Sequence, residues 1–274
     1  MANYSKVLLV GYQGLLGTEI RQVLADWSLV LWDKEHDITK PGIKQAIIEL
    51  KPDLVINCAG YTAVDQCETD QLCQSVNGTA LQYLAEAAKA IGAKLVHFST
   101  DYVFDGQKAA GYLETDQPNP LSAYGRSKAS GEKFLLTVGP GFYLIRTSWL
   151  YGRSGKNFVE TVINLAKERP SLKVVNDQVG APTWARDLAL AVKQLLIDSP
   201  ADGIYHLTAS GSAAWFEVAQ KIVAILGLNC RIEPQTTAEL DRPAKRPAYS
   251  ILINSKRPAL RPWPEMLAAY LENQ

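Results

Sequence analysis

Residues 6–17 read KVLLVGYQGLLG, and this stretch indicates the fold class of the 274-residue chain. The opening run KVLLV is short, apolar and partly β-branched, which is typical of a buried strand. Gly11, Gly14 and Gly17 follow it at intervals of three residues, and a helical pattern continues to residue 25. A strand, a glycine-rich turn and a helix in this order predict the first unit of a parallel α/β sheet.

The three glycines have separate physical roles in such a turn. Gly11 permits a tight turn, Gly14 lets the backbone approach a phosphate group, and Gly17 lets the helix pack against the strand. The N–H groups and the dipole at the start of the helix favour an anionic ligand. A glycine-rich loop without a ligand is the alternative, but the preceding strand favours a dinucleotide site. The candidate contacts in this turn are Gly11, Gln13, Gly14, Leu15, Leu16 and Gly17.

Strand and helix patterns alternate along the first two-thirds of the chain. This alternation predicts a parallel sheet with helices on both faces and right-handed crossovers. We expect strands at 6–10, 29–32, 54–57, 94–99 and 142–147, and helices at 14–25, 43–50, 71–90 (with Asp70 as N-cap) and 127–138.

The last third of the chain is less regular. We expect helices at 156–168, 184–197 and 215–226 and a strand at 203–207, while four prolines within 236–262 disfavour long helices there. The fold class expected is α/β: a Rossmann-like, doubly wound parallel sheet with a small C-terminal substrate-binding lobe. Residues 1–150 would form the dinucleotide-binding domain. Residues 151–274 would form mostly the lobe, with some segments returning to the sheet.

Composition and charge bear on the class of function. Lys+Arg and Asp+Glu balance at 28 each, so net charge gives no support to a nucleic-acid or membrane partner. The N-terminal apolar run is too short to span a membrane, and we expect a cytoplasmic protein. The four cysteines match no common zinc spacing. We expect the cysteines and the three histidines to be scattered buried or surface residues, without a structural disulfide.

Charged residues after the second strand bear on the choice of cofactor. Asp33 could accept hydrogen bonds from an adenosine ribose, which favours NAD. Lys34 could meet the additional phosphate of NADP, although a solvated turn is an equally good interpretation of this residue. NADH and NADPH therefore both stay open. Asp37 and Ile38 are further candidates at the adenine end.

Tyr124 and Lys128 form a YxxxK pair, whose members share one face of a helix. A lysine ammonium near a phenol stabilises the phenolate, so we expect a tyrosine pKa below its usual value of about 10. Such a tyrosine can act as general acid or base near neutral pH. With 12 tyrosines the pair alone is weak evidence, and its placement carries the prediction. Thr100 ends the preceding strand and would bring a hydroxyl to the same edge of the sheet.

Several longer runs resemble the extended short-chain dehydrogenase/reductases, and within them the dTDP-4-dehydrorhamnose reductases. The resemblance covers nearly the whole chain, and STDYVFDG and GAPTWARD are its most specific parts. It implies NAD(P)H-dependent reduction of the C4 keto group of dTDP-4-dehydro-L-rhamnose to dTDP-L-rhamnose, for cell-envelope polysaccharides. The segments that carry it are GYQGLLG (11–17), NCAGYTAVD (57–65), Val76-Asn77 with Ala80, STDYVFDG (99–106), YGRSK (124–128), RTSWLYG (146–152) and DQVGAPTWARD (177–187).

The resemblance also implies residue roles. Thr100 would orient the C4 carbonyl, Tyr124 would donate the proton, and Lys128 would hold the nicotinamide ribose and tune Tyr124. Ala59, Gly60, Tyr61 and Asn77 would contact the cofactor together with Tyr124 and Lys128. The sugar-binding wall would be Thr62, Val64, Thr100, Asp101, Tyr102, Tyr124 and Trp149, with a core tryptophan as the alternative interpretation of Trp149.

Other interpretations remain open at this point. Some family members hold Mg2+ at a dimer contact, but only Glu19 has a counterpart here, so no metal is predicted. The expected assembly is a monomer or homodimer with a nucleotide-sugar substrate. The alternatives are a reductase or epimerase of another nucleotide sugar, and a non-catalytic NADP-binding regulatory subunit. The complete set Thr100, Tyr124 and Lys128 disfavours the last.

Overall fold

Six parallel strands form the central sheet, in the order β2-β1-β3-β4-β5-β10. The computed structural model describes residues 4–139 and 141–272. The strand order reverses between β1 and β3, which is the place where open α/β sheets bind ligands beyond the carboxyl ends of their strands. The doubly wound sheet expected from the sequence is therefore confirmed. Its strands are β1 (Val7–Val10), β2 (Leu29–Trp32), β3 (Leu54–Asn57), β4 (Lys94–Thr100), β5 (Phe142–Thr147) and β10 (Gly203–His206).

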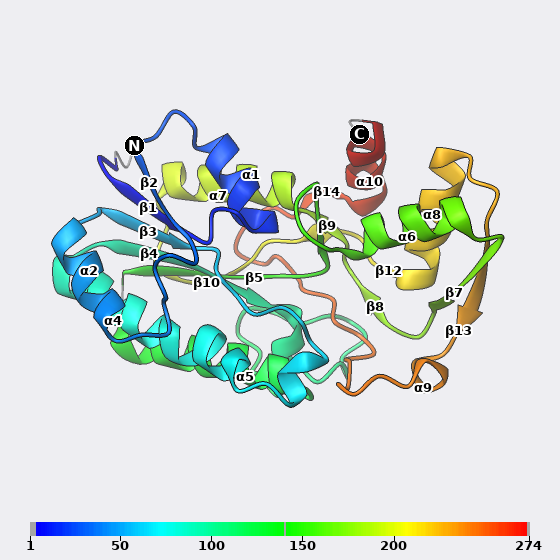
Figure 1. Ribbon diagram of the computed structural model, residues 1–274, viewed down its shortest axis with the longest axis horizontal. Helices are drawn as coiled ribbons and strands as arrows, with labels where there is room; N and C mark the ends of the chain where they lie inside the picture. The colour runs from blue at the N-terminus through cyan, green and yellow to red at the C-terminus, as the bar shows by residue number, and fades with distance from the viewer. Residues whose placement is uncertain (1–3, 140, 273–274) are drawn as a thin grey trace.

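Helices cover both faces of this sheet (Figure 1). Neighbouring strand residues point to opposite faces, so Val7 and Leu9 join one core while Leu8 and Val10 join another. The first core packs under α1 (Leu15–Val23) and α7 (Ala185–Asp198). The second packs under α2 (Gly42–Leu50), α4 (Ala80–Ile91) and α5 (Ala123–Val138). Within the described part of the chain, no helix combines the length and apolar character needed to cross a membrane.

A third core lies in a smaller lobe at one end of the sheet (Figure 1). Three helices and one parallel strand pair build it: α6 (Phe158–Glu168), α8 (Trp215–Leu226), α10 (Trp263–Glu272), β7 (Ser171–Val175) and β13 (Arg231–Gln235). Short strand pairs join the lobe to the sheet: β6 (Leu150–Tyr151) with β9 (Thr183–Trp184), β8 (Val179–Gly180) with β12 (Ala213–Ala214), and β11 (Ala209–Ser210) with β14 (Leu260–Pro262). Between 236 and 262 the structure has only the short helix α9 (Thr237–Leu240) and β14, as the prolines predicted.

Two helices differ from their expected limits. The helix expected at 71–90 is interrupted, and the structure has α3 (Leu72–Gln74), a π-helical turn η2 (Ser75–Thr79) and then α4. The N-cap of α3 is Gln71 and not the expected Asp70, although Asp70 Oδ1 accepts from the Leu72 N–H at 2.9 Å. The helix α5 begins at Ala123, four residues before the expected start, because Ser122 Oγ caps it by accepting from the Gly125 N–H at 3.1 Å.

The cysteines contradict one expectation. Cys67 and Cys73 form a disulfide, so the prediction of scattered cysteines without a disulfide is wrong. The 3-10 turn η1 (Gln66–Glu68) and α3 fold the chain back over six residues and bring the two sulfurs together. The cysteine spacing matches no common zinc pattern, and the pairing of Cys67 with Cys73 becomes evident only from the folded turn. Cys58 and Cys230 are free thiols.

Candidate active site

A cavity of about 700 Å3 opens where β1, β2 and β3 end. Most of the residues expected to contact a dinucleotide line this cavity. They lie at or directly after the carboxyl ends of the three strands. The expected residues in its lining are Gly11, Gln13, Gly14, Asp33, Lys34, Asp37, Ile38, Ala59, Gly60 and Tyr61, and the others are Val10, His36, Thr39, Cys58, Leu72 and Val76. His36 had no sequence signal for this place, and its ring stacks on Trp32 at 4.1 Å between centroids.

The glycine turn is shaped by close backbone approaches. Gly11 has φ +76°, and a Cβ there would lie 2.6 Å from the Ala59 nitrogen. A Cβ on Gly17 would lie 2.0 Å from the Gly11 carbonyl oxygen, so the helix packs as closely as the sequence predicted. No side chain caps α1 at Gly14, which leaves the N–H groups of its first turn to an anionic ligand. These features fit the diphosphate of a dinucleotide.

Leu15, Leu16 and Gly17 do not line the cavity, although the sequence placed them among the cofactor contacts. The Leu16 side chain is buried in the core and Leu15 packs against the same core. Their contribution to a ligand is therefore limited to backbone N–H groups.

Asp33 closes the glycine turn from the second strand. Its Oδ2 accepts from the Gln13 N–H at 3.0 Å, and its Oδ1 accepts from the Lys34 N–H at 3.0 Å. These bonds fix the carboxylate at the cavity wall, where it can also accept from ribose hydroxyls. Lys34 lines the same wall and supplies a positive charge. The cavity wall therefore carries both a carboxylate suited to the ribose of NAD, on Asp33, and a positive charge suited to the additional phosphate of NADP, on Lys34.

Thr100 and Tyr124 meet at the carboxyl end of β4. The Tyr124 side chain lies beside the Thr100 side chain, and both residues are buried. Burial raises the pKa of Tyr124 to about 12, and the neighbouring Thr100 hydroxyl opposes this rise. The expected tyrosine pKa below its usual value is therefore wrong, because the cost of burying a phenolate dominates. The Lys128 Nζ donates to the Phe98 carbonyl at 3.1 Å.

Lys128 is itself strongly perturbed. Burial lowers its pKa to about 8, although the carboxylate of Glu132 opposes this shift. Glu132 lies one helical turn further along α5 and forms a buried ion pair with Arg146 on β5 at 2.7 Å. This ion pair anchors α5 to the sheet directly beneath the lysine.

Two glycines let α5 approach its neighbours. A Cβ on Gly125 would lie 2.2 Å from the Tyr102 carbonyl oxygen, and one on Gly131 would lie 2.3 Å from the Asn77 carbonyl oxygen. The first contact brings the start of α5 against the turn η3 (Asp101–Val103) that follows Thr100. The position of Tyr124 therefore depends on the absence of a side chain at residue 125.

Asn77 connects Tyr61 at the cavity wall to α5. Its Oδ1 accepts from the Tyr61 N–H at 2.9 Å, and its Nδ2 donates to the Tyr61 carbonyl at 2.9 Å and to Ser127 Oγ at 3.0 Å. The π-helical turn η2 carries this side chain, as is common for such turns at functional sites. Asn77 does not line the cavity, so it acts on a cofactor through Tyr61.

The expected sugar-binding residues fall into different surroundings. Thr62 is exposed, whereas Val64 and Tyr102 pack with Tyr124 in a small cluster. Asp101 is 2% exposed and lies behind Thr100, whose Oγ1 donates to Asp101 Oδ1 at 2.9 Å. Burial raises the pKa of Asp101 to about 6. We therefore expect Asp101 to act through Thr100.

Trp149 has one covered face. Its ring stacks on Trp215 of the lobe, with 3.5 Å between centroids. Its backbone has φ +49°, a conformation that non-glycine residues rarely adopt. A Cβ on Gly180 would lie 2.5 Å from the ring, so Gly180 makes room for it. The residue is half-buried at the junction of sheet and lobe. This exposure is intermediate between that of a core tryptophan and that of a residue on an open sugar-binding wall.

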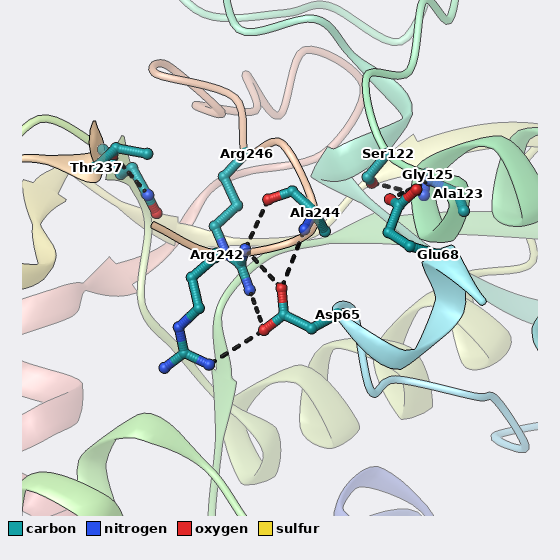
Figure 2. A network of polar contacts seen from close by, with 10 residues as sticks. Asp65, Glu68, Ser122, Ala123, Gly125, Thr237, Arg242, Ala244 and Arg246 are labelled. Atoms are coloured by element: carbon teal, nitrogen blue, oxygen red, sulfur yellow. Dashed lines mark hydrogen bonds and ion pairs between the residues drawn. The ribbon is translucent and has the colours of Figure 1, made fainter. Parts of the chain in front are cut away.

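The loop after β3 is tied to the C-terminal part of the chain (Figure 2). Asp65 accepts from Arg246 Nη1 and Nη2, both at 3.0 Å, and from Arg242 Nη1 at 3.1 Å. The Ala244 N–H also donates to Asp65 Oδ1, at 3.3 Å. This network holds a segment that is distant in sequence against the loop that carries Tyr61 and Val64.

Acidic residues form no metal cluster in the described ranges 4–139 and 141–272, where no three of His, Cys, Asp and Glu lie in a group suited to a metal ion. Glu19, the one acid that the sequence suggested, is buried and pairs with Arg186 at 3.5 Å.

Comparison with known proteins identifies the family. The family model described as the RmlD substrate binding domain matches residues 5–274. The chain belongs to this family. A dTDP-4-dehydrorhamnose reductase of Burkholderia thailandensis is 41% identical over 270 residues, covering 91% of this chain and 90% of the relative. A crystal structure of the Bacillus anthracis dTDP-4-dehydrorhamnose reductase in complex with NADP has a TM-score of 0.95 and 36% identity, covering 98% and 99%.

The comparisons also include a differently named relative. A probable dTDP-4,6-dihydroxy-2-methyloxan-3-one 4-ketoreductase of Streptomyces antibioticus is 39% identical over 282 residues, covering 96% of both chains. The expected resemblance to dTDP-4-dehydrorhamnose reductases is confirmed by these comparisons.

Proposed function

We propose that this protein reduces the C4 keto group of dTDP-4-dehydro-L-rhamnose to give dTDP-L-rhamnose, with NADPH or NADH as reductant. The observation that carries the proposal is that Tyr124 and Thr100 are neighbours, on the same edge of the sheet as the dinucleotide cavity. The reductase names of relatives near 40% identity and the NADP complex of the Bacillus anthracis protein support it.

The cavity residues would hold a nicotinamide dinucleotide, which in its reduced form would supply the hydride for C4. The Tyr124 hydroxyl would donate to the sugar carbonyl, and the neighbouring Thr100 hydroxyl would join it by turning its proton from Asp101 to the carbonyl oxygen. Tyr124 stays protonated at neutral pH and gives its proton to the developing alkoxide. The buried ammonium of Lys128 stabilises the tyrosinate that results. Each residue therefore acts at a stated atom: Tyr124 and Thr100 at the carbonyl oxygen, and Lys128 at the phenol.

A second candidate is the reduction of a different dTDP-linked ketosugar. The alignment with the Streptomyces antibioticus 4-ketoreductase covers 96% of both chains at 39% identity. The Burkholderia thailandensis reductase is 41% identical, so sequence identity alone does not decide between the two sugars. A non-catalytic role is disfavoured, because Thr100, Tyr124 and Lys128 are all present and brought together.

Substrate choice is tested with a panel of nucleotide ketosugars. We expect NADPH consumption to be fastest with dTDP-4-dehydro-L-rhamnose, and NMR of the product to show the L-rhamno configuration at C4. A higher kcat/KM for another dTDP ketosugar would move the assignment to the second candidate.

Cofactor use follows from the paired Asp33 and Lys34. We expect turnover with both NADH and NADPH, and comparing the two specificity constants measures this. Exclusive use of one cofactor would refute dual use. The proposal also includes a cytoplasmic location and a monomer or homodimer.

A further inference from the structure

The Cys67–Cys73 disulfide lies against the catalytic helix. Cys73 Sγ is 3.3 Å from Ser127 Oγ and 3.6 Å from Asn77 Nδ2. Both cysteines share one small apolar cluster with Tyr124. The reaction proposed above uses neither sulfur, so this bond is a chemical group at the site without an assigned role.

The loop closed by this disulfide supports both parts of the site. Glu68 Oε1 accepts from the Ala123 N–H at 2.8 Å and so holds the start of α5 (Figure 2). Asp70 Oδ2 accepts from the Tyr61 hydroxyl at 2.7 Å, and Tyr61 lines the cofactor cavity. Leu72 lies within the loop and lines the same cavity. Any change in the shape of the loop is therefore transmitted to the cofactor wall and to Tyr124.

We propose that Cys67 and Cys73 form a reversible oxidation site, whose disulfide form binds the dinucleotide more tightly and turns over faster than its dithiol form. Two thiols cannot approach as closely as two bonded sulfurs, so reduction must spread a loop packed against α5. Disulfides inside the cytosol, where the proposed function places this protein, are usually redox-active. The inference takes only the nicotinamide dinucleotide and this location from the proposed function.

The exchange is written with a small dithiol as reductant. Its thiolate attacks Cys67 Sγ, the S–S bond breaks, and Cys73 leaves as a thiolate beside Ser127 Oγ and Asn77 Nδ2. The second thiol of the reductant then attacks the mixed disulfide and releases Cys67. Two electrons pass to the protein, the reductant becomes a cyclic disulfide, and the cysteines take up two protons. A small-molecule disulfide reverses the reaction.

The free cysteines do not compete in this exchange. Its surroundings raise the pKa of the Cys58 thiol, which disfavours the thiolate that takes part in exchange. Cys230 packs in the separate core of the lobe. Cys230→Ala therefore serves as a matched control that removes a thiol without touching the loop.

The test compares wild-type protein equilibrated with oxidised glutathione and with dithiothreitol. Thiol titration after denaturation should give two thiols in the first sample and all four in the second, since two of the four cysteines are bridged. NADPH titration should give a Kd at least about fivefold weaker after reduction, the effect expected from losing one supporting hydrogen bond. Re-oxidation should restore the tighter NADPH Kd. This comparison uses only wild-type protein, so it does not depend on the folding of a variant.

The variants sharpen this comparison. Cys67→Ser and Cys73→Ser should both show the weaker Kd and no response to dithiothreitol, whereas Cys230→Ala should respond like the wild type. Four free thiols under oxidising conditions, or one NADPH Kd in both states, would overturn the inference. A redox-dependent Kd without turnover of the rhamnose precursor would support the inference while refuting the proposed function.

Discussion

Lys128 is the residue whose surroundings say most about the pH dependence of the site. It is 5% exposed, its ammonium donates to the Phe98 carbonyl, and Glu132 and Cys58 are the groups that favour its charged form. Because burial lowers its pKa to about 8, the positive charge is complete below this pH and is lost as the pH rises through it. Tyr124, with a pKa of about 12, stays protonated over the same range.

We therefore predict that kcat/KM falls as the pH rises, with a midpoint near the Lys128 pKa of about 8. This ratio reports groups of the free enzyme, so it can be compared directly with the structure. In Lys128→Arg the fall of kcat/KM should move to higher pH, since a guanidinium does not lose its proton in this range. A flat profile up to about pH 10 in the wild type would contradict this role.

Individual residues also show where sequence reasoning fails. The YxxxK spacing correctly placed Tyr124 and Lys128 on one helix near Thr100. It gave the wrong direction for the tyrosine pKa, because spacing carries no information on burial. Similarly, His36 and Leu72 line the cavity only because their segments fold beside it, and neither residue belongs to a motif.

Among the helices and strands, the close approach of α5 to the turn after β4 sets the distance between Tyr124 and Thr100. We predict that Gly125→Ala destabilises the protein by about 1–3 kcal/mol, because the added methyl group overlaps the Tyr102 carbonyl. We also expect a lower kcat, because α5 must move away from Thr100. Chemical denaturation and steady-state kinetics measure the two effects.

Gly42→Ala is the matched control for this substitution. Gly42 begins α2, and a Cβ added there would meet no atom within 4 Å, so alanine should be neutral or stabilising by up to about 1 kcal/mol. Equal stability and equal kcat for Gly125→Ala and the wild type would show that the close approach does not matter.

The contact between the loop after β3 and the C-terminal segment is a second junction between elements (Figure 2). We predict that Asp65→Ala lowers stability by about 1–3 kcal/mol, because it removes charged hydrogen bonds to Arg246 and Arg242. Amide exchange should become faster in residues 242–250. Asp26→Ala removes an exposed partner of Lys193 and should leave the stability almost unchanged. Unchanged exchange in 242–250 would argue against an anchoring role for Asp65.

Across the molecule as a whole, the central sheet was predictable and the lobe was less so. Strand positions in the sheet were found because buried parallel strands are continuous apolar runs. In the lobe, β13 carries Pro234, which disfavours a strand prediction, although it pairs with β7 along its full length. The helix α10 begins at Trp263 directly after a proline-rich segment and was not predicted. Its Met266, Leu267 and Tyr270 are fully buried in the lobe core.

The same contrast applies to the site. The glycine turn and the proposed catalytic residues depend on local spacing, so the sequence alone could suggest them. The Asp65–Arg246 contact joins residues 181 positions apart, and the Cys67–Cys73 bond depends on an irregular turn. Neither follows from a local pattern, because tertiary folding alone brings the partners together.

The most direct test of the proposed reduction is the loss of NADPH absorbance with dTDP-4-dehydro-L-rhamnose, measured for wild type and Tyr124→Phe. We predict rapid oxidation by the wild type. The variant should keep the NADPH Kd and lose about 10²- to 10⁴-fold in kcat, because only the proton donor is removed. A variant with a near-normal rate would contradict the role of Tyr124. A wild type that binds NADPH but does not oxidise it with this sugar would contradict the proposed reaction.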